Sequence, residues 1–411
     1  MTASGTADSA DVVVIGAGPG GSATAHFLAK AGVNALLLDR AEFPRDKTCG
    51  DGLTPRALAV LDDLGVLDAL NKIGFRIDGL EFHAPRGQVI TSPIPETDNM
   101  PNYQMIVPRK VLDHVILERT VASGARFRGG VHVTGVEPSG RGVYVKGKHQ
   151  GRSISFHGRV AVVATGANSR LLMRSGILDK MPPTALAARA YFEGVRGLST
   201  RAQAHFGGIP LPGYGWVFPL SDHTANVGVG YWPFGFIRRK KHLPTRRLFE
   251  NFVKTPKIRP MLEGARQVGP VKGYPIRVDF PTAITFGERT ILVGEAAGLV
   301  NPLSGEGIDF ALENGKIAAR FLVEKFELGD FSAQTLAAYD RVLRARFQSL
   351  FVALSLIQKL YANPALLNRV VNVTAHNPEL KTLFVKIILG TQNAADSGVI
   401  LKILRYVVFG R

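Results

Sequence analysis

The chain has one cysteine, Cys49, among 411 residues. A single thiol excludes an internal disulfide framework and a multi-cysteine zinc or iron–sulfur site, so no metal site is predicted, and it fits a reducing cytoplasm. No apolar run reaches the roughly 18 residues that a membrane-spanning helix needs. The first ten residues are polar and lack the basic segment and apolar core of a signal peptide. We therefore expect a cytoplasmic protein that does not span a membrane.

Acidic residues are also scarce, because 33 Asp and Glu stand against 50 Lys and Arg, giving a formal net charge of +17. Such a charge favours anionic partners, either nucleic acid or the acidic headgroups of a bilayer. No nucleic-acid signature is present, whereas a basic cluster at residues 238–242 directly follows the aromatic residues of 231–236. That combination is typical of peripheral membrane proteins, although a solvated loop has the same composition. We expect an anionic membrane surface, and no nucleic acid, among the partners.

The hydrophobic pattern predicts an α/β protein with more than one structural unit. Residues 11–16 and 35–39 are short apolar strands on either side of a helix at 18–31, and a polar loop follows at 40–55. Residues 184–282 are rich in strand patterns, with 213–219 and 225–232 flanking a turn. A later strand and helix, at 290–293 and 307–326, resemble a return to the first unit, and helical patterns then follow at 335–361, 365–373, 380–389 and 399–409.

Three units follow from this pattern. We predict a discontinuous nucleotide-binding domain, an antiparallel β-sheet substrate domain and a helical C-terminal region, after a disordered N-terminus at residues 1–10. The nucleotide-binding domain takes residues 11–76, 103–182 and 283–330, the substrate domain residues 77–102 and 183–282, and the helical region residues 331–411.

The first turn of the nucleotide-binding domain has the spacing G-x-G-x-x-G, with glycines at 16, 18 and 21. Gly16 permits a tight turn, Gly18 allows the backbone to approach a pyrophosphate, and Gly21 permits close packing of helix and strand. The following helix offers its amides and dipole to phosphate. Asp39, at the end of the next strand, is placed to accept hydrogen bonds from a ribose. The pattern predicts a dinucleotide but does not distinguish NAD from FAD.

Two later segments favour FAD. Residues 293–309 resemble the second FAD fingerprint of the glutathione-reductase-like flavoproteins, with Glu295 where that fingerprint has Asp. Residues 164–170 resemble the D-G-x-x-S segment of flavin hydroxylases, but Thr165 takes the Asp position, which puts direct reduction by NAD(P)H in doubt. Arg109 matches a family position that contacts FAD at the start of a helix. The resemblance implies a Rossmann-type FAD-binding domain of the p-hydroxybenzoate-hydroxylase type.

Residues 43–53 and 211–219 narrow the resemblance further. They are similar to the two hallmark segments of geranylgeranyl reductases, the second fitting P-x-Y-x-W-x-F-P, and the likeness runs from about residue 11 to residue 315. Within that family the chain most resembles actinobacterial menaquinone reductases, which saturate one isoprene unit of the quinone tail. The resemblance implies an FAD-dependent reductase that saturates an isolated C=C bond of a polyprenyl chain, either in menaquinone or in a geranylgeranyl lipid.

The resemblance also assigns candidate residues. Cys49 is the candidate catalytic residue, because an isolated alkene needs a proton donor as well as a hydride, and the alternative is a buried structural thiol. Side chains 214, 216 and 218 alternate along a strand and share one face, so they suit either a prenyl chain or an ordinary sheet core; they are Tyr214, Trp216 and Phe218. The candidate cofactor-binding residues are Gly16, Gly18, Gly21, Asp39, Arg40, Cys49, Gly50, Arg109, Gly166, Gly294, Glu295, Pro302, Gly305, Gly307 and Ile308.

The alternatives share the fold and differ in chemistry. A flavin halogenase is expected to show W-x-W-x-I-P near residue 214, and an aromatic hydroxylase is expected to keep Asp at position 165. A tailoring reductase or monooxygenase acting on a secondary metabolite is a closer alternative, and a lipid-binding flavoprotein that only relays electrons is a third. Any of the reductases needs an external electron donor, which is NAD(P)H, ferredoxin or another reductase.

Overall fold

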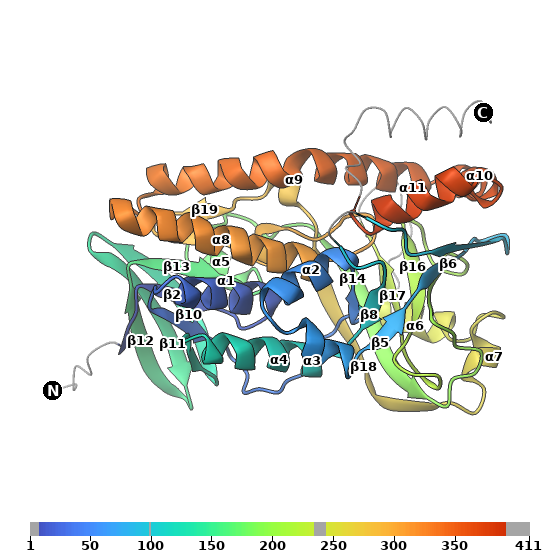
Figure 1. Cartoon of the computed structure of the whole chain (residues 1–411), viewed down its shortest axis with the longest axis horizontal. Helices are drawn as coiled ribbons and strands as arrows, with labels where there is room; N and C mark the ends of the chain where they lie inside the picture. Colours follow the sequence, from blue (N-terminus) through green and yellow to red (C-terminus); the bar gives the residue numbers. More distant parts are fainter. Residues whose placement is uncertain (1–7, 98–99, 234–243, 392–411) are drawn as a thin grey trace.

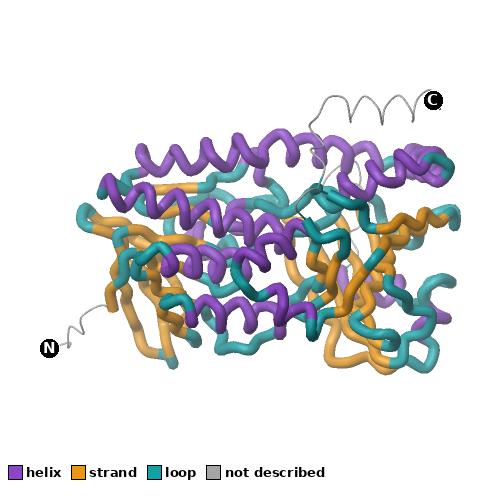
Figure 2. Tube along the Cα trace, viewed as in Figure 1, coloured by secondary structure: helices purple, strands orange, loops and turns teal. Residues whose placement is uncertain are grey.

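The computed structural model describes residues 8–97, 100–233 and 244–391. Within these residues the strands form four sheets. Figure 1 shows the long helices running side by side along the molecule, and Figure 2 shows strands gathered at its two ends. The strand that leads into the glycine turn at residues 16–21 and the candidate substrate strand at residues 213–219 belong to different sheets.

The central sheet has six strands in the order β19-β20-β13-β2-β3-β9, all parallel except the edge strand β19. The residues of β2 and β3 are entirely apolar and buried, as in a parallel sheet covered on both faces. Helix α1 packs against α4 and α8. The predicted βαβ unit is present as β2, α1 and β3, and β20, near residue 290, pairs with β13 in the same sheet. The bounds are β2 Val12–Ile15, α1 Pro19–Lys30, β3 Ala35–Leu38, α4 Arg109–Ala122, β9 Arg126–Arg128, β13 Val160–Val163, β19 Phe286–Gly287, β20 Thr290–Leu292 and α8 Ile308–Leu328.

A four-stranded sheet, in the order β1-β12-β11-β10, lies at the left end in Figure 1. The expected disorder of residues 1–10 is wrong for its last residues, since β1 (Asp8–Ser9) pairs with β12 in parallel. The Ala10 amide donates to the His157 carbonyl at 3.0 Å, and Asp8 forms an ion pair with Arg126 at 2.8 Å. The other strands are β10 Val131–Ser139, β11 Gly142–His149 and β12 Arg152–Gly158. The short helix α5 (Arg170–Arg174) contacts β10.

The seven-stranded sheet has the order β18-β14-β17-β16-β15-β6-β7. Its pairs are antiparallel except β15 with β6, which run parallel. β16 and β17 form the predicted hairpin, and helix α6 buries Leu248, Phe249 and Phe252 against the sheet. The bounds are β6 Gly79–His83, β7 Val89–Pro93, β14 Thr184–Glu193, β15 Arg201–His205, β16 Gly213–Pro219, β17 Thr224–Tyr231, α6 Thr245–Phe252, α7 Arg259–Leu262 and β18 Arg266–Arg277.

A small three-stranded sheet has the order β4-β8-β5. Along the chain, β4 and β5 precede β6 and β7 of the seven-stranded sheet, and β8 follows them. Its first strand, β4 (Gly52–Leu53), lies inside the stretch expected to be a loop and pairs with β8 (Gln104–Ile106). This pairing anchors the end of the segment that carries Cys49. The remaining elements here are β5 Phe75–Ile77, α2 Pro55–Asp63 and α3 Leu67–Asn71.

The C-terminal helices are α9 (Ala333–Tyr361), α10 (Pro364–Ala375) and α11 (Pro378–Ile388). α10 and α11 contact β7, and their apolar residues join one core with the residues of β6 and β7. The predicted helix at 399–409 lies outside the described residues. These helices therefore cover the β7 edge of the seven-stranded sheet (Figure 1).

Helix α9 buries one face against the core of the central sheet and exposes Val342, Val352 and Leu356 on the other. In the described part of the chain, no helix taken alone is both long and apolar enough to cross a membrane. α9 and α10 together satisfy length and composition, but with a bend of 109° between them.

Candidate active site

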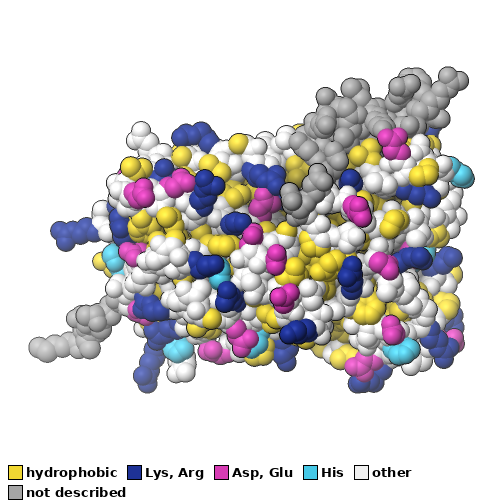
Figure 3. Space-filling view, viewed as in Figure 1, with side chains coloured by type: hydrophobic (Ala, Val, Ile, Leu, Met, Phe, Trp, Pro, Cys, Tyr) yellow, Lys and Arg dark blue, Asp and Glu magenta, His cyan; other side chains and the backbone are white. Residues whose placement is uncertain are grey.

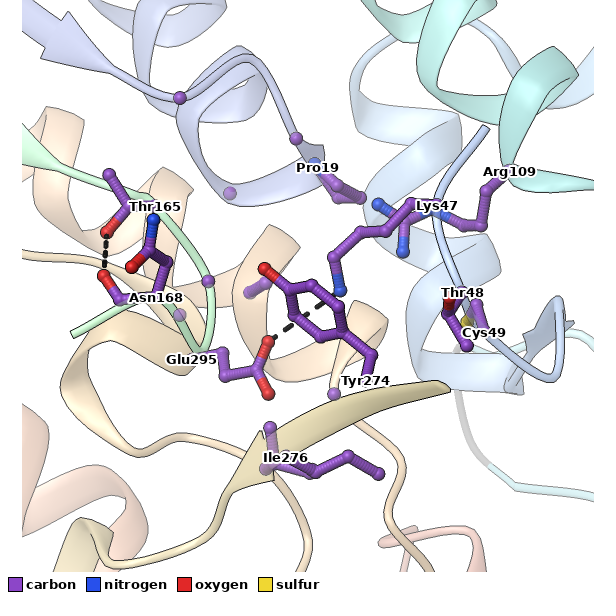
Figure 4. Close-up of a pocket in the computed structure, with 18 of the residues that line it drawn as sticks. Pro19, Lys47, Thr48, Cys49, Arg109, Thr165, Asn168, Tyr274, Ile276 and Glu295 are labelled. Carbon is purple, nitrogen blue, oxygen red and sulfur yellow. Dashed lines mark hydrogen bonds and ion pairs between the residues drawn. The ribbon is translucent and has the colours of Figure 1, made fainter. Parts of the chain in front are cut away.

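A cavity of about 630 Å³ lies between the central sheet and the seven-stranded sheet. Its walls come from the β2–α1 turn, the loop at residues 39–52, strands β16 and β18, and the segment at residues 304–308. Figure 4 shows side chains of the loop, of β18 and of the segment after β20 around one space, with Lys47, Tyr274 and Glu295 close together. The glycine turn and the aromatic strand thus share a single cavity.

The glycine turn has the geometry that its spacing predicts. Gly16 has a φ of +108°, and a Cβ there would lie 2.4 Å from the Ala164 carbonyl oxygen. A Cβ at Gly21 would lie 1.8 Å from the Gly16 carbonyl oxygen, so this position requires glycine for packing. At Gly18, by contrast, the nearest atoms to such a Cβ are guanidinium nitrogens of Arg45 and Arg109, both 4.0 Å away. Gly18 therefore faces open space between two cations.

The N-terminus of α1 has no side-chain cap and no acidic residue in its first turn. Asp113 holds the two nearby cations, forming ion pairs at 2.7 Å with both Arg45 and Arg109. Burial alone would raise the pKa of Asp113, but the two guanidinium groups hold it below its ordinary value. Uncapped amides, a helix dipole and two cations suit a pyrophosphate, so this turn fits FAD.

Asp39 lies where the sequence predicts a ribose contact, but its carboxylate already binds the loop. One oxygen accepts from the Ala17 amide at 2.8 Å and the other from the Ala41 amide at 2.9 Å. Each oxygen has a second lone pair available for a ribose hydroxyl. The carboxylate therefore fixes the turn around the nucleotide end of the cavity.

A buried network holds the loop that carries Cys49. Asp51 adopts a φ of +67° and accepts hydrogen bonds from the Tyr191 hydroxyl at 2.7 Å, the Asn226 amide at 2.8 Å and the Arg109 backbone amide at 3.2 Å. Asn226 also donates to the Cys49 carbonyl at 2.8 Å. Burial raises the pKa of Asp51 to about 6, although its hydrogen-bond donors and nearby cations favour the charged form. The seven-stranded sheet thereby clamps the loop onto the cofactor domain.

The same loop reaches across the cavity at Lys47. Its ammonium lies 3.8 Å from a carboxylate oxygen of Glu295 and 4.8 Å from the centre of the Tyr274 ring (Figure 4). Glu295 also accepts a hydrogen bond from the Arg277 amide at 3.1 Å. The unexpected glutamate of the second fingerprint therefore links the loop, β18 and the segment after β20.

Thr165, which takes the place of the hydroxylase aspartate, donates its hydroxyl to the Asn168 carbonyl at 3.3 Å (Figure 4). The neighbouring Gly166 has a φ of +65°, and a Cβ there would lie 3.2 Å from Glu295 Oε2. This segment closes the cavity wall opposite the loop of Cys49.

The aromatic side chains of β16 form a continuous strip in the cavity wall. The ring centres of Tyr214 and Trp216 are 6.1 Å apart, as are those of Trp216 and Phe218. Tyr214 donates its hydroxyl to the Ser304 carbonyl, and Trp216 donates its indole N–H to Asn226 at 2.9 Å. Both polar tips are therefore satisfied, and the strip offers the cavity an apolar surface.

Cys49 lies on the wall of this cavity, and burial raises the pKa of its thiol. A Cβ at the adjacent Gly50 would lie 3.1 Å from the Phe218 ring, so the loop backbone rests directly on the aromatic strip. The thiol is therefore neutral at physiological pH.

Most of the predicted site residues meet in this cavity. Gly21 and Pro302 are the exceptions: Gly21 packs within the turn, and the Pro302 carbonyl accepts a hydrogen bond from Gln358. The predicted residues that line the cavity are Gly16, Gly18, Asp39, Arg40, Cys49, Gly50, Arg109, Gly166, Tyr214, Trp216, Phe218, Gly294, Glu295, Gly305, Gly307 and Ile308.

Sequence reasoning missed the residues that fix the cavity from outside the fingerprints. Asp51, Tyr191 and Asn226 form the clamp on the loop, and Arg45 shares Asp113 with Arg109. Only Asp51, in the dipeptide Asp-Gly, carried a local turn signal. The others lie on strands or in a loop where their residue type alone points to no partner.

The family comparisons agree with this geometry. Residues 9–352 match the family model described as FAD binding domain. Menaquinone reductase of Mycobacterium tuberculosis is 36% identical over 327 residues, covering 77% of each chain. Digeranylgeranylglycerophospholipid reductase 1 of Methanopyrus kandleri is 31% identical over 357 residues, covering 83% of this chain and 88% of the relative.

Solved structures show the same fold. A geranylgeranyl bacteriochlorophyll reductase-like protein from Thermoplasma acidophilum superposes with a TM-score of 0.82 at 21% identity, over 98% of this chain and 97% of that one. A flavin-dependent brominase superposes less well, with a TM-score of 0.75 at 21% identity, over 97% and 99% of the two chains. The chain therefore belongs to the FAD-binding flavoprotein family that includes the geranylgeranyl and menaquinone reductases, and its cofactor is FAD.

Proposed function

We propose that the protein reduces an isolated C=C bond of a polyprenyl chain, in menaquinone or in a geranylgeranyl lipid. The observation that carries the proposal is the aromatic strip of β16, which lines the same cavity as the FAD-binding turn. Such a strip binds a chain that offers no hydrogen-bonding groups, because burying apolar area stabilises the complex. The relatives at 36% and 31% identity are named menaquinone reductase and digeranylgeranylglycerophospholipid reductase 1, and both names support a lipid that carries a polyprenyl chain as the substrate.

The chain's own groups have separable tasks in this proposal. The α1 amides, Arg45 and Arg109 hold the pyrophosphate, and Asp39 holds the ribose. Residues 305–308, which line the cavity at the N-terminus of α8, would hold the flavin end of the cofactor, where the helix dipole would favour negative charge. When bound and reduced, FAD supplies a hydride. Cys49 and the aromatic strip shape the wall that positions the alkene.

A reductase of this kind needs an electron donor, which we propose is NAD(P)H, ferredoxin or another reductase. Thr165 replaces an acid that serves NAD(P)H in flavin hydroxylases. We therefore expect NADH and NADPH to reduce the bound FAD slowly, and a protein donor to do so faster. Stopped-flow absorbance of the flavin with each donor tests this, and rapid reduction by NADPH alone would contradict it.

A membrane surface is the proposed route to the substrate. The formal charge of +17 favours anionic headgroups. On the face drawn in Figure 3 the basic side chains are interspersed with acidic ones. The basic cluster at residues 238–242, which lies outside the described residues, is the sequence feature that supports this contact. Sedimentation with phosphatidylcholine vesicles, with and without phosphatidylglycerol, should show binding only to the anionic vesicles and its loss at high salt.

Anaerobic turnover tests the proposed reaction. The purified protein is loaded with FAD, reduced with dithionite and mixed with menaquinone or a geranylgeranyl lipid. The mass of the lipid is then measured by mass spectrometry. A gain of two hydrogens is expected. A flavin-dependent tailoring reductase, monooxygenase or halogenase acting on a secondary metabolite is the alternative that the brominase-like fold keeps open. Oxygen or halogen incorporation in aerobic incubations would favour it.

A further inference from the structure

The proposed reaction needs a proton as well as a hydride, and the cavity wall offers few groups that can hold one. Among the described residues that line the cavity, four carry carboxyl groups, namely Asp39, Asp46, Glu295 and Glu306. A carboxylate that is tied to cations or amides stays ionised and cannot donate a proton. The bonding of each carboxyl group therefore decides which of them can act as the acid.

Three of the four carboxylates are committed to the protein. Asp39 accepts two backbone amides. Asp46 forms ion pairs at 2.6 Å with both Arg189 and Lys272, which lower its pKa against the effect of burial. Glu295 accepts the Arg277 amide and pairs with Lys47. The carboxyl groups of all three are therefore already engaged by donors of the protein.

Glu306 differs from them. Within residues 8–97, 100–233 and 244–391, no hydrogen bond or ion pair engages its carboxyl group. Among the described residues, the cation that lowers its pKa is Arg109, which is already bound to Asp113 in a two-point ion pair. Burial, and then the nearby carboxylate of Asp309, raise the pKa of Glu306 well above its usual range. The surroundings of Glu306 therefore favour the protonated form of its carboxyl group.

The position of Glu306 places this acid beside the proposed reacting groups. It stands between Gly305 and Gly307, in the FAD fingerprint at the entrance to α8. A Cβ added at Gly52 would lie 4.0 Å from Glu306 Oε2, so the carboxyl group lies under the loop that carries Cys49. Glu306 also lies close to Tyr214 of the aromatic strip, because the pKa of Tyr214 is raised by burial and then by the ionised form of Glu306.

Three other proton-bearing side chains of the wall, those of Cys49, Tyr214 and His132, are weaker candidates. Burial raises the pKa of both the Cys49 thiol and the Tyr214 hydroxyl, which makes each a poorer acid. The Tyr214 proton is also committed to the Ser304 carbonyl. His132 lies beside Val131, whose amide donates to the Asp39 carbonyl at 2.8 Å, so it stands at the nucleotide end of the cavity.

We infer that Glu306 delivers the proton to the alkene, an assignment that rests on the proposed function. The C=C π bond breaks as one carbon takes the Glu306 proton and the other takes the hydride supplied by reduced FAD. The alkene gains two electrons and two hydrogens, and the flavin is oxidised. Glu306 is left as a carboxylate and regains a proton from water, while the external electron donor restores the reduced cofactor. Cys49 positions the substrate and keeps its proton.

Glu306→Gln tests the assignment, because glutamine keeps the shape and loses the acid. In single turnover with reduced enzyme, we expect hydrogen gain by the lipid to slow by about 100-fold or more. Glu306→Asp keeps an acid and should retain part of the rate. Glu118→Gln, on the exposed face of α4, is the matched control and should behave as the wild type. The FAD content of each variant is measured from the absorbance of released flavin.

Infrared spectroscopy gives a readout that does not depend on turnover. The difference between wild type and Glu306→Gln should contain the C=O stretch of a protonated carboxylic acid at pH 7, disappearing as the pH is raised. If the variant loses FAD, the same difference is taken between the two FAD-free proteins. An ionised Glu306 at pH 7, or a wild-type rate in FAD-loaded Glu306→Gln, would overturn the assignment. No hydrogen gain by the wild type would instead refute the proposed function, and the assignment with it.

Discussion

Gly18 and Gly21 lie in the same turn but should fail in different ways when replaced by alanine. At Gly21 the new Cβ would meet the Gly16 carbonyl oxygen at 1.8 Å, a backbone clash that no rotamer relieves. At Gly18 it would meet nothing nearer than two guanidinium nitrogens at 4.0 Å, and the backbone φ of −76° suits alanine. Gly21→Ala therefore distorts the backbone of the turn, whereas Gly18→Ala places a methyl group in the space where we expect the pyrophosphate of FAD.

These distances set the expected magnitudes. For the FAD-free protein, Gly21→Ala should lower the free energy of unfolding by about 3 kcal/mol or more, as overpacking against fixed backbone does. Gly18→Ala should change it by less than about 1 kcal/mol, the effect of alanine in place of glycine at an N-cap. FAD should nevertheless bind Gly18→Ala at least about tenfold more weakly, because the methyl group costs the pyrophosphate about 1.4 kcal/mol of contact with the turn.

Urea unfolding of the FAD-free proteins and titration of FAD by flavin fluorescence measure the two quantities separately. Both variants should lose FAD affinity, and only Gly21→Ala should lose stability. If Gly18→Ala binds FAD as tightly as the wild type, the pyrophosphate does not lie at this turn. Equal instability of both variants would show that Gly18 is a packing position as well.

Three further predictions concern the cavity walls. Asp113→Asn leaves the buried guanidinium of Arg109 and the partly buried guanidinium of Arg45 without their carboxylate, and should lower the free energy of unfolding by about 3 kcal/mol. Asp63→Asn, which breaks a half-exposed pair with Lys316, should lower it by less than about 1 kcal/mol. Urea unfolding compares the two variants, and equal losses would contradict the stabilising role of the buried Asp113 carboxylate. Tyr191→Phe removes a hydrogen bond that favours ionised Asp51, so the pKa of Asp51 should rise above about 6. The free energy of unfolding should therefore fall more at pH 7, where the carboxylate is charged, than at pH 5. A loss of unfolding free energy that does not depend on pH would contradict this. Phe218→Ala should raise the KM for the prenyl lipid and leave FAD content unchanged, and a loss of FAD without a change in KM would show that the ring supports the cofactor instead.

Local patterns predicted the part of the site that is built locally. The turn at Gly16, the helix after it and Asp39 lie within about one βαβ unit, where glycine spacing and apolar strands directly dictate geometry. The aromatic strip was equally readable, because alternation along β16 decides which side chains share a face. These features depend on short-range backbone periodicity.

The groups that join the two regions were not predictable in this way. Asn226 bonds the Cys49 carbonyl across 177 residues of sequence, and Tyr191 bonds Asp51 across 140. In the sequence, Tyr191 and Asn226 are simply members of two predicted strands, and nothing near them indicates a partner so distant along the chain. Glu306 was missed for a different reason, since it occupies an unspecified position of the fingerprint. That its carboxyl group has no hydrogen-bond or ion-pair partner among the described residues becomes evident only when the cavity and its other carboxylates are placed in space.

The position of the added hydrogens tests the central claim most directly. Menaquinone is incubated with the reduced, FAD-bound protein, the quinol is reoxidised in air, and tandem mass spectrometry locates the mass gain. Reoxidation removes hydrogens from the ring system and leaves those on the tail. We predict a gain of two hydrogens confined to one isoprene unit of the tail. If the tail shows no gain in mass and only the ring system is reduced, the protein relays electrons and is not a prenyl reductase.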